Sequence, residues 1–320
     1  ATENLDTDSD GVGNNADSDD DNDGLSDSGE IVLGTNALLR DSDFDSLTDG
    51  FENSVSRDAL TADYKISSSW AHSCVIHDGG IGCWGSDAGG QSSPPEITDA
   101  LDVDTGGYFS CALRKGGKID CWGENADLRT PTGQNYKSMT LGGYHVCAIK
   151  DDGTVACFGG DDYGQSTVPQ LSNPVALSAG VFHTCALDDS GVICWGDNEY
   201  GQTNVPNLVN PTAISSGQDH NCAQDTAGLV CWGRNDNLQS DVPSSLPDLV
   251  TFDAGGSLNC GIADGSVTCW SQGWGTSNIP SLTNPVQVST GSTFACALDD
   301  NGVTCWGENG SEGRIDFPAG

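Results

Sequence analysis

Seventeen carboxylates crowd the first sixty residues of the 320-residue chain, which hold only two arginines and no cysteine. In "DDDNDGLSDSGE", residues 19 to 30, acidic side chains stand at positions 1, 3, 5, 9 and 12 of a twelve-residue window, with glycine at position 6. Oxygens at these positions, with the main-chain carbonyl of position 7, can encircle calcium, and glycine permits the sharp turn. The expected ligands are Asp19, Asp21, Asp23, Leu25, Asp27 and Glu30.

The same spacing occurs before and after this window. Residues 41 to 52 offer Asp41, Asp43, Asp45, Leu47, Asp49 and Glu52, although Ser46 replaces the glycine. An earlier copy offers Asp6, Asp8, Asp10, Val12 and Asp17, and its final aspartate has a shorter arm for bidentate chelation than glutamate. We expect two calcium ions, and a third if the first loop also binds. Without a cation these carboxylates would repel one another, so calcium would determine the fold of this stalk of EF-hand-like loops. The alternative is an acidic linker with chance spacing.

A resemblance to a known type of repeat supports the interpretation of this segment as calcium-binding loops. "GEIVLGTNALLRDSDFDSLTDGFE" is similar to the thrombospondin type 3 repeats of bacterial surface proteins, and the resemblance covers residues 4 to 53. It implies a calcium-stiffened stalk, which we place at residues 1–58.

The rest of the chain is organised by its 14 cysteines, which fall into seven pairs nine or ten positions apart. The first members recur every 36 to 38 residues, so seven repeats fill residues 62–320. A fixed period in this range indicates a repeat architecture. The pairs are Cys74 with Cys83, Cys111 with Cys121, Cys147 with Cys157, Cys185 with Cys194, Cys222 with Cys231, Cys260 with Cys269 and Cys296 with Cys305.

Each repeat has the pattern of short strands separated by turns. In the fourth repeat, "PVALSAG" precedes "HTCALDD" and "GVICWG", which flank a glycine-containing turn. A spacing of nine or ten places the two cysteines opposite each other in an antiparallel hairpin, where they can form a disulfide. A rival scheme joins the second cysteine of one repeat to the first of the next, with Cys305 closing on Cys74. Zinc is a poorer explanation, because the ligand spacing of zinc sites is absent.

Sheets of about 37 residues cannot bury both faces alone, so they must pack on one another. Seven such sheets commonly close into a ring, and we expect an all-β chain with a seven-bladed β-propeller after the stalk. An aromatic residue follows each second cysteine and would form the core between blades: Trp84, Trp122, Phe158, Trp195, Trp232, Trp270 and Trp306.

The repeat itself carries a second resemblance. "GVFHTCALDDSGVICWGDNEYGQTNVP" resembles the repeat of the regulator of chromosome condensation family, in the short bacterial form also seen in the β-lactamase inhibitor propeller. The resemblance covers about four-fifths of the chain and implies a seven-bladed propeller without implying one activity. Leu128-Arg129 replaces the family's Gly-Gln in the second repeat, and the sixth repeat loses the Trp-Gly.

Charge limits the partners. The chain has 47 acidic against 11 basic residues and a net charge of -36, whereas phosphate binding depends on the opposite sign. We therefore expect no nucleic acid partner. Seven potential disulfides indicate an oxidising compartment, so the expected location is extracellular or at the cell surface, with the periplasm as an alternative. The sequence has no apolar stretch long enough to span a membrane and begins at alanine, as expected after removal of a leader or for a fragment.

Nothing in the sequence points to catalysis. Four of the five histidines, His72, His145, His183 and His220, stand two residues before a first cysteine and so belong to the repeat framework. We expect them to bond main-chain groups between strands. Common nucleophile, metalloprotease and phosphate-loop motifs are absent.

Function is then expected where the repeats differ. The segments before the first cysteines carry Trp70, Tyr108, Tyr144 and Phe182 in repeats one to four, and Gln218, Asp219, Ser257 and Thr293 afterwards. Rigid aromatic residues of this kind anchor protein partners, and Trp274 could join them. The alternative is that these rings only pack against neighbouring blades.

The sequence therefore predicts a secreted or cell-surface, non-enzymatic propeller that recognises another protein, or copies of itself in a surface assembly, on a calcium-bound stalk. A soluble protein inhibitor of an extracellular enzyme and a carbohydrate-acting propeller enzyme are the alternatives.

Overall fold

The computed structural model describes residues 7–8, 12–40, 42, 49, 53, 65–77, 80–131, 133, 135–244, 246, 249–272, 276–299 and 302–316. Two compact units divide the chain, residues 1–64 with 299–302 and residues 65–298 with 303–320. Within the described ranges, no helix is both long and apolar enough to cross a membrane.

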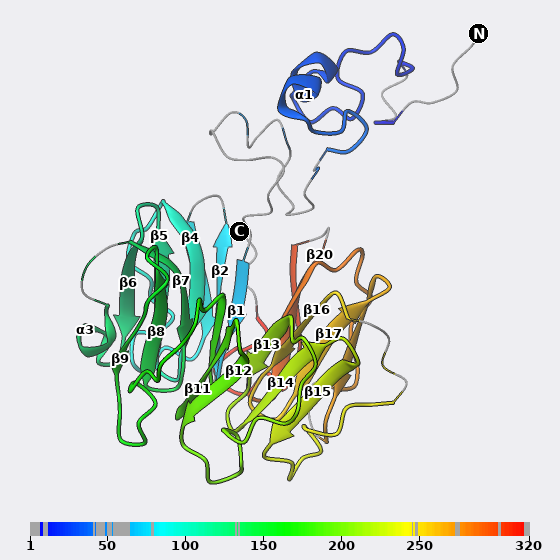
Figure 1. The fold of residues 1–320 in the computed structure, drawn as a ribbon. Helices are drawn as coiled ribbons and strands as arrows, with labels where there is room; N and C mark the ends of the chain where they lie inside the picture. The colour runs from blue at the N-terminus through cyan, green and yellow to red at the C-terminus, as the bar shows by residue number, and fades with distance from the viewer. Residues whose placement is uncertain are drawn as a thin grey trace. The chain divides into compact units, whose positions relative to one another are not determined.

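The larger unit consists of seven three-stranded antiparallel sheets, each formed by consecutive strands (Figure 1). One sheet corresponds to one cysteine repeat, and we call it a blade. In chain order the inner, middle and outer strands are β1 (Lys65–Ser68), β2 (His72–His77) and β3 (Gly80–Gly85); β4 (Ala100–Thr105), β5 (Phe109–Arg114) and β6 (Lys118–Gly123); β7 (Tyr136–Leu141), β8 (His145–Lys150) and β9 (Val155–Gly159); β10 (Ala176–Ala179), β11 (His183–Asp188) and β12 (Gly191–Gly196); β13 (Ala213–Ser216), β14 (His220–Asp225) and β15 (Gly228–Gly233); β16 (Thr251–Ala254), β17 (Asn259–Ala263) and β18 (Ser266–Trp270); β19 (Gln287–Thr290), β20 (Phe294–Asp299) and β21 (Gly302–Gly307). The expected seven-bladed, all-β architecture is the one found.

The hairpin register places the two cysteines of each repeat opposite each other. For example, Cys185 pairs with Cys194 between β11 and β12, and the longer spacing of the third repeat keeps Cys147 opposite Cys157. All seven disulfides join cysteines within one blade, with Cα atoms 4.0 to 4.1 Å apart: Cys74 with Cys83, Cys111 with Cys121, Cys147 with Cys157, Cys185 with Cys194, Cys222 with Cys231, Cys260 with Cys269 and Cys296 with Cys305. The within-repeat pairing is therefore confirmed and the scheme that links neighbouring repeats is wrong.

The two cysteines of each disulfide differ in burial, a difference that the sequence reading did not anticipate. The first cysteine of every pair lies on the middle strand and is fully buried or nearly so. The second lies on the outer strand, which has a neighbouring strand on one side only, and is therefore partly exposed. These partly exposed cysteines are Cys83, Cys121, Cys157, Cys194, Cys231, Cys269 and Cys305. Each disulfide thus ties the edge of a blade to its buried centre.

The Gly-Gln segment that closes a repeat forms turns in the structure. Gly164 has a φ of 81°, which glycine adopts without strain, and the following Gln165 is buried. In the second repeat the short helix α3 (Ala126–Arg129) takes this place, and Arg129 occupies the glutamine position.

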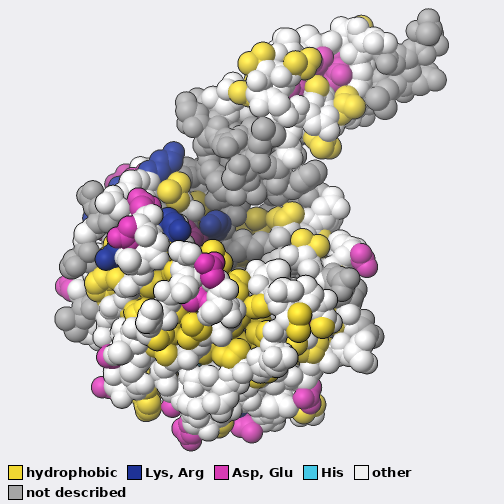
Figure 2. Space-filling model, viewed as in Figure 1, with side chains coloured by type: hydrophobic (Ala, Val, Ile, Leu, Met, Phe, Trp, Pro, Cys, Tyr) yellow, Lys and Arg dark blue, Asp and Glu magenta, His cyan; other side chains and the backbone are white. Residues whose placement is uncertain are grey.

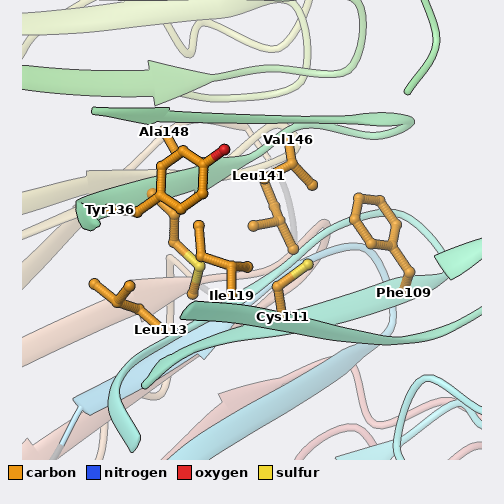
Figure 3. Close-up of a cluster of buried hydrophobic side chains, with 9 residues drawn as sticks. Phe109, Cys111, Leu113, Ile119, Tyr136, Leu141, Val146 and Ala148 are labelled. Carbon is orange, nitrogen blue, oxygen red and sulfur yellow. The ribbon is translucent and has the colours of Figure 1, made fainter. Parts of the chain in front are cut away.

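The aromatic residues after the second cysteines form the core between blades, as predicted. Trp122 of the second blade clusters with Cys74 and Ile76 of the first, and Trp195 of the fourth clusters with Cys147 of the third. Between the second and third blades the cluster is wholly apolar in its centre, where Phe109 approaches Leu141 and Val146 (Figure 3). Each sheet thus buries its faces against its neighbours.

The smaller unit contains helix α1 (Asp27–Leu33), which starts at the N-cap Ser26 and ends at Gly34, with φ of 92°. Three hydrogen bonds of one kind repeat along this unit. The main-chain N of Thr7 donates to Asn14 Oδ1, that of Asp20 to Asp27 Oδ1 and that of Ser42 to Asp49 Oδ1, each over seven residues. These bonds join positions 2 and 9 of the three twelve-residue windows, so the three windows have this hydrogen bond in common.

Candidate functional site

Four of the predicted partner residues form one continuous aromatic cluster. Ring centroids of Trp70 lie 5.2 Å from Tyr108 and 5.8 Å from Tyr144, both edge to face, and Tyr144 stacks on Phe182 at 5.3 Å. Tyr163, which the sequence reading missed, extends the cluster because its ring lies 4.8 Å from Phe182. Rings from the first four blades are therefore in contact, and we call these five residues the aromatic face.

The aromatic face lies on one end of the ring of blades. The segment before each middle strand and the segment after each outer strand are joined by main-chain bonds, such as Glu124 N to Tyr108 O at 2.9 Å and Asp197 N to Phe182 O at 2.8 Å. Acidic residues therefore stand directly beside the rings.

Most cations of the described ranges lie elsewhere on the ring of blades. Arg114 and Lys118 face each other at the hairpin between β5 and β6, at the other end of the strands. In Figure 2, Lys and Arg side chains gather at one edge of the ring, whereas Asp and Glu are scattered. Beside the aromatic face, Glu124 and Asp197 therefore stand together with the cation Arg129, whose guanidinium lies 5.9 Å from the Tyr144 ring centroid.

The rings are both packed and exposed. Tyr108 keeps 40% of its surface exposed and Tyr163 keeps 53%, while Trp70, Tyr144 and Phe182 are partly buried. The rings therefore support one another across blades and still present surface to solvent, while partner binding by them stays a prediction.

A groove of about 740 Å³ opens beside the aromatic face, with walls from the second, third and fourth blades. Its lining includes Tyr144, Tyr163 and Phe182, the polar residues Asn125 and Asp162, and Arg129. Concave sites that combine aromatic walls with a few polar groups are the usual form of binding pockets.

Arg129 fixes the wall of this groove. Its guanidinium lies 4.6 Å from the Phe109 ring centroid and 5.9 Å from that of Tyr144, and only 9% of the residue is exposed. Its Nε donates to the carbonyl of Tyr144 at 3.1 Å, and its Nη1 donates to the carbonyl of Glu124. Arg129, at the position where other repeats have the glutamine of Gly-Gln, is thus the local change that shapes this side of the groove.

The predicted polar arc has internal partners. Asp219 Oδ2 pairs with Arg234 Nη1 at 3.2 Å, and Gln218 Nε2 donates to Ser292 Oγ at 2.9 Å. Ser257 Oγ donates to the carbonyl of Ser292, and Thr293 Oγ1 accepts from Arg314. Trp274 lies outside the described residues.

The expectation that the four framework histidines bond main-chain groups between strands is wrong. Their Nε2 atoms bond side chains of the next blade. Each histidine is fully buried, and its Nε2 lies 2.6 to 2.9 Å from a side-chain oxygen of the next blade. The pairs are His72 with Ser110 Oγ, His145 with Thr184 Oγ1, His183 with Asn221 Oδ1 and His220 with Asn259 Oδ1. Each of these partners also donates to the main-chain carbonyl of a glutamine, such as Gln165 or Gln202. The same carbonyls of Gln91, Gln165 and Gln202 accept from the indole Nε1 of Trp122, Trp195 and Trp232.

This network is present at four blade interfaces and is replaced by apolar packing at two. At the interface of the seventh and first blades, Phe294 replaces the histidine while the first blade keeps Ser73, whose Oγ shares a hydrogen bond with Ser68 Oγ. Where the second blade has Phe109 in place of histidine, the third has Val146 in place of the polar partner, and the two pack together. The sixth blade has Leu258 and the seventh has Ala295 at the same positions, again in one cluster. The histidines therefore serve the packing of blades. Burial lowers the pKa of all four, to about 4 for His72 and His220 and to about 3 for His145.

A second ring of residues surrounds the central channel, a space of about 160 Å³. The inner-strand residue opposite each first cysteine is a hydroxyl or a carboxylate: Ser67, Asp104, Thr140, Ser178, Ser215, Asp253 and Ser289. Asp104 accepts from Ser67 Oγ and Leu141 N, at 2.8 Å each, and so joins three blades. Burial raises its pKa to about 7. Asp253 bridges Ser215 and Thr290 in the same manner.

The smaller unit brings the central carboxylates of the second calcium window together. Asp19, Asp21 and Asp23 each offer an oxygen, and these oxygens all lie within 4.8 Å of one another. Asp21 is 1% exposed and Glu30 is fully buried, yet Asp21 Oδ2 and Glu30 Oε2 have no hydrogen-bond partner. An unpaired buried carboxylate oxygen is costly, and a hard cation with oxygen ligands would satisfy it.

Electrostatics at these carboxylates fits a cation site. Burial, Asp23, Asp19 and Asp49 raise the pKa of Asp21 to about 6, and burial with Asp21, Asp23 and Asp49 raises that of Glu30 to about 7. Like charges raise a carboxyl pKa in this way when no cation offsets them. Asp49, from the third window, is itself fully buried, and its carboxylate accepts from Ser42 N and Oγ.

Five more of the predicted metal ligands lie within the described residues. Leu25 and Asp27 are described, and Leu25 N donates to Asp23 Oδ1 at 2.7 Å. Asp8, Val12 and Asp17 of the first window are described, with Asp17 Oδ1 accepting from Ser18 N. Outside the described residues lie Asp6, Asp10, Asp41, Asp43, Asp45, Leu47 and Glu52.

Comparison with known proteins supports the repeat assignment. The family model for the regulator of chromosome condensation (RCC1) repeat matches residues 101–127, 136–165, 175–202 and 286–313. No curated protein sequence matches the chain significantly.

Solved structures share the fold. The entire ectodomain of the Physcomitrella patens receptor kinase CR4 has a TM-score of 0.65 at 23% identity, over 76% of this chain and 73% of that one. The CRINKLY WD40 ectodomain of the Arabidopsis thaliana receptor kinase ACR4 has a TM-score of 0.63 at 24% identity, over 79% and 97%. Human WBSCR16 has a TM-score of 0.58 at 15% identity, over 71% and 84%. Together with the seven three-stranded blades, these matches show that the larger unit has a β-propeller fold and that the matched segments resemble RCC1 repeats.

Proposed function

We propose that this chain is an extracellular or cell-surface protein-recognition module, in which the propeller binds another protein through its aromatic face and has no enzymatic activity. The continuous set of ring contacts across four blades carries the proposal, because it holds exposed aromatic surface rigid at one end of the ring. Rigid aromatic side chains contribute much of the binding energy at protein interfaces and lose little entropy on binding.

The disulfides support the location. Every cysteine in the chain belongs to a within-blade disulfide, and such density is typical of oxidising compartments. Two of the similar structures are ectodomains of plant receptor kinases, which shows that this fold is used outside cells in those proteins.

Calcium belongs to the same proposal. Asp19, Asp21, Asp23 and Glu30 would hold the ion, with Asp27 and the carbonyl of Leu25 completing the shell, and the unpaired oxygens of Asp21 and Glu30 favour it. The ion would offset the repulsion of buried carboxylates and so stabilise the local fold of residues 12–40. This unit would then act as the thrombospondin type 3-like stalk that carries the propeller.

Site-specific photo-crosslinking tests the recognition role. A photoreactive phenylalanine analogue at Tyr108 or Tyr163 should crosslink the protein, in its native surface assembly, to one discrete protein. The control position is Val250, which is 84% exposed and is not part of the aromatic face. Crosslinks from Val250 alone, or none from Tyr108 and Tyr163, would remove the proposed binding face.

A further inference from the structure

Two neighbouring repeats have a tyrosine at the same position, Tyr163 and Tyr200, but the residues around the two rings differ. The guanidinium of Arg234 lies over the ring of Tyr200, six residues after Cys194, at 4.8 Å from the ring centroid. Carboxylates hold that guanidinium from two sides, with Asp219 Oδ2 at 3.2 Å from Nη1 and Asp236 Oδ2 at 2.8 Å from Nε. The chain therefore builds its own arginine site on Tyr200, from a ring face and two carboxylates.

One repeat earlier, the same positions hold other residues. Tyr163, six residues after Cys157, corresponds to Tyr200, and Asp197 stands at the position of Arg234. Phe182 replaces Asp219, so a second ring lies 4.8 Å from the tyrosine ring. The internal cation has thus been replaced by an acidic residue, while the tyrosine is retained.

This change coincides with the groove. Tyr163, Phe182 and the exposed Asp162 all line it. Asp197 is bonded through its main chain to Phe182, and its carboxylate accepts from Gln202 Nε2 at 2.9 Å. The lining also contains the cation Arg129, which is 9% exposed and bonded to the carbonyls of Tyr144 and Glu124. At the Tyr163 end, a cationic side chain would meet the rings of Tyr163 and Phe182 and the carboxylate of Asp162, the same kinds of group that hold the internal arginine of the next repeat.

We propose that the groove beside Tyr163 receives an arginine side chain from the partner protein, which takes the place over Tyr163 that Arg234 takes over Tyr200. The proposal rests on the recognition role of the aromatic face and specifies its partner as a basic protein segment. Planar guanidinium stacks on aromatic rings while bonding carboxylates, which an ammonium group does less well. The charge of -36 further favours association with a basic partner.

The test compares two blocked pentapeptides, Gly-Ser-Arg-Ser-Gly and the same peptide with neutral citrulline in place of arginine. Each is titrated into the isotopically labelled full-length protein with calcium at physiological salt, and amide shifts are followed by NMR. The arginine peptide should shift amides in residues 160–165 and 182–183. The citrulline peptide should bind about threefold to fivefold more weakly, as expected for the loss of a cation–π contact.

Variants locate the effect. Tyr163→Ala and Asp162→Asn should each weaken binding of the arginine peptide by about threefold or more. Tyr200→Ala is the matched control, because its site is already filled by Arg234, and it should leave the affinity unchanged. Asp197→Arg should weaken binding strongly, since it restores the internal cation that the next repeat possesses.

Several outcomes would overturn the proposal. They are equal affinity for the two peptides, an equal loss in Tyr200→Ala, or shifts spread evenly over the acidic surface. A neutral glycan that competed for the groove while both peptides failed would also overturn it. Crosslinking of a partner from Tyr163 together with equal affinity for the two peptides would remove the arginine site and leave the proposed function standing.

Discussion

His183 donates from Nε2 to Asn221 Oδ1 in the next blade at 2.7 Å, because Asn221 already uses its Nδ2 to donate to the carbonyl of Gln202. The amide orientation therefore fixes the histidine tautomer, which leaves the unprotonated Nδ1 buried without a partner. A second proton on this ring would be placed where nothing accepts it. The histidine interfaces thus require neutral imidazole.

The first prediction concerns pH. An unfolded histidine binds a proton near pH 6.5, whereas burial lowers the pKa of His220 to about 4. Between these values the unfolded state binds more protons, so stability is complete above pH 6.5 and falls as pH is lowered to about 4. The slope is up to about 1.4 kcal/mol per pH unit for one such histidine.

The pair variant His220→Leu with Asn259→Ala isolates this effect, because it copies the Leu258 and Ala295 interface found elsewhere in the ring. Asp104, whose raised pKa of about 7 acts in the opposite direction, is common to both proteins and cancels. Denaturant unfolding between pH 7 and 4 should show a shallower loss of stability in the variant. Parallel curves for the two proteins would refute neutral packing of His220.

The second prediction concerns the glycine that stands five residues before six of the seven first cysteines. A Cβ on Gly142 would collide with the ring of His145 and the carbonyl of Gly180 in the next blade. Gly142→Ala should therefore destabilise the propeller by about 2 kcal/mol or more. Gly80→Ala is the control, since its nearest new contact, the carbonyl of His77, is at an ordinary 3.5 Å. Equal melting temperatures for the two variants would show that the close approach is absent.

The third prediction concerns the disulfides. Replacing Cys185 and Cys194 by alanine removes a crosslink that closes a loop with sequence separation 9. The chain-entropy model gives a loss of about 2 to 3 kcal/mol for a loop of this size. Thermal unfolding of the variant against the intact protein measures it. Peptide mapping without reduction should recover Cys185 joined to Cys194, and a Cys194 to Cys222 peptide would contradict the pairing.

The fourth prediction concerns calcium. Chelation should make residues 12–40 protease-sensitive while residues 65–316 stay intact, because the propeller is held by apolar packing and disulfides. Glu30→Gln should weaken calcium binding more than Ser28→Ala, since only the first change removes a ligand charge. Calcium titration calorimetry with limited proteolysis compares them. Equal protease resistance with and without chelator would mean that calcium does not order this unit.

Much of the fold could be predicted because each repeat is marked by residues at short, fixed spacings in the sequence. The nine-residue separation of Cys185 and Cys194 is a property of one hairpin, so it determined the register and the disulfide. The histidine partners could not be predicted in the same way, because Asn221 lies 38 residues beyond His183 and meets it only when blades pack. A partial signal was available: where Phe109 and Leu258 replace the histidine, the next repeat also loses its polar residue, although Phe294 faces a first repeat that keeps Ser73.

The aromatic face likewise contains residues that the sequence predicted and residues that it did not. Tyr108, Tyr144 and Phe182 share one position in the repeat and Trp70 stands one position earlier, so the comparison of this segment between repeats found all four. Tyr163 belongs to another segment and joins them only through the ring geometry, so the sequence reading missed it. Arg129 was noticed as a departure from the family pattern, but its place between two rings depends on packing of the second blade against the third.

Hydrogen–deuterium exchange tests the central claim most directly, by comparing the purified protein with the protein in its native surface assembly. If the aromatic face is the recognition surface, assembly should slow exchange in residues 106–109, 142–145, 160–165 and 180–183. The hairpins at residues 114–118 and 150–154, at the other end of the blades, should exchange at unchanged rates. Protection confined to those hairpins, or no protection anywhere in the ring, would contradict the account.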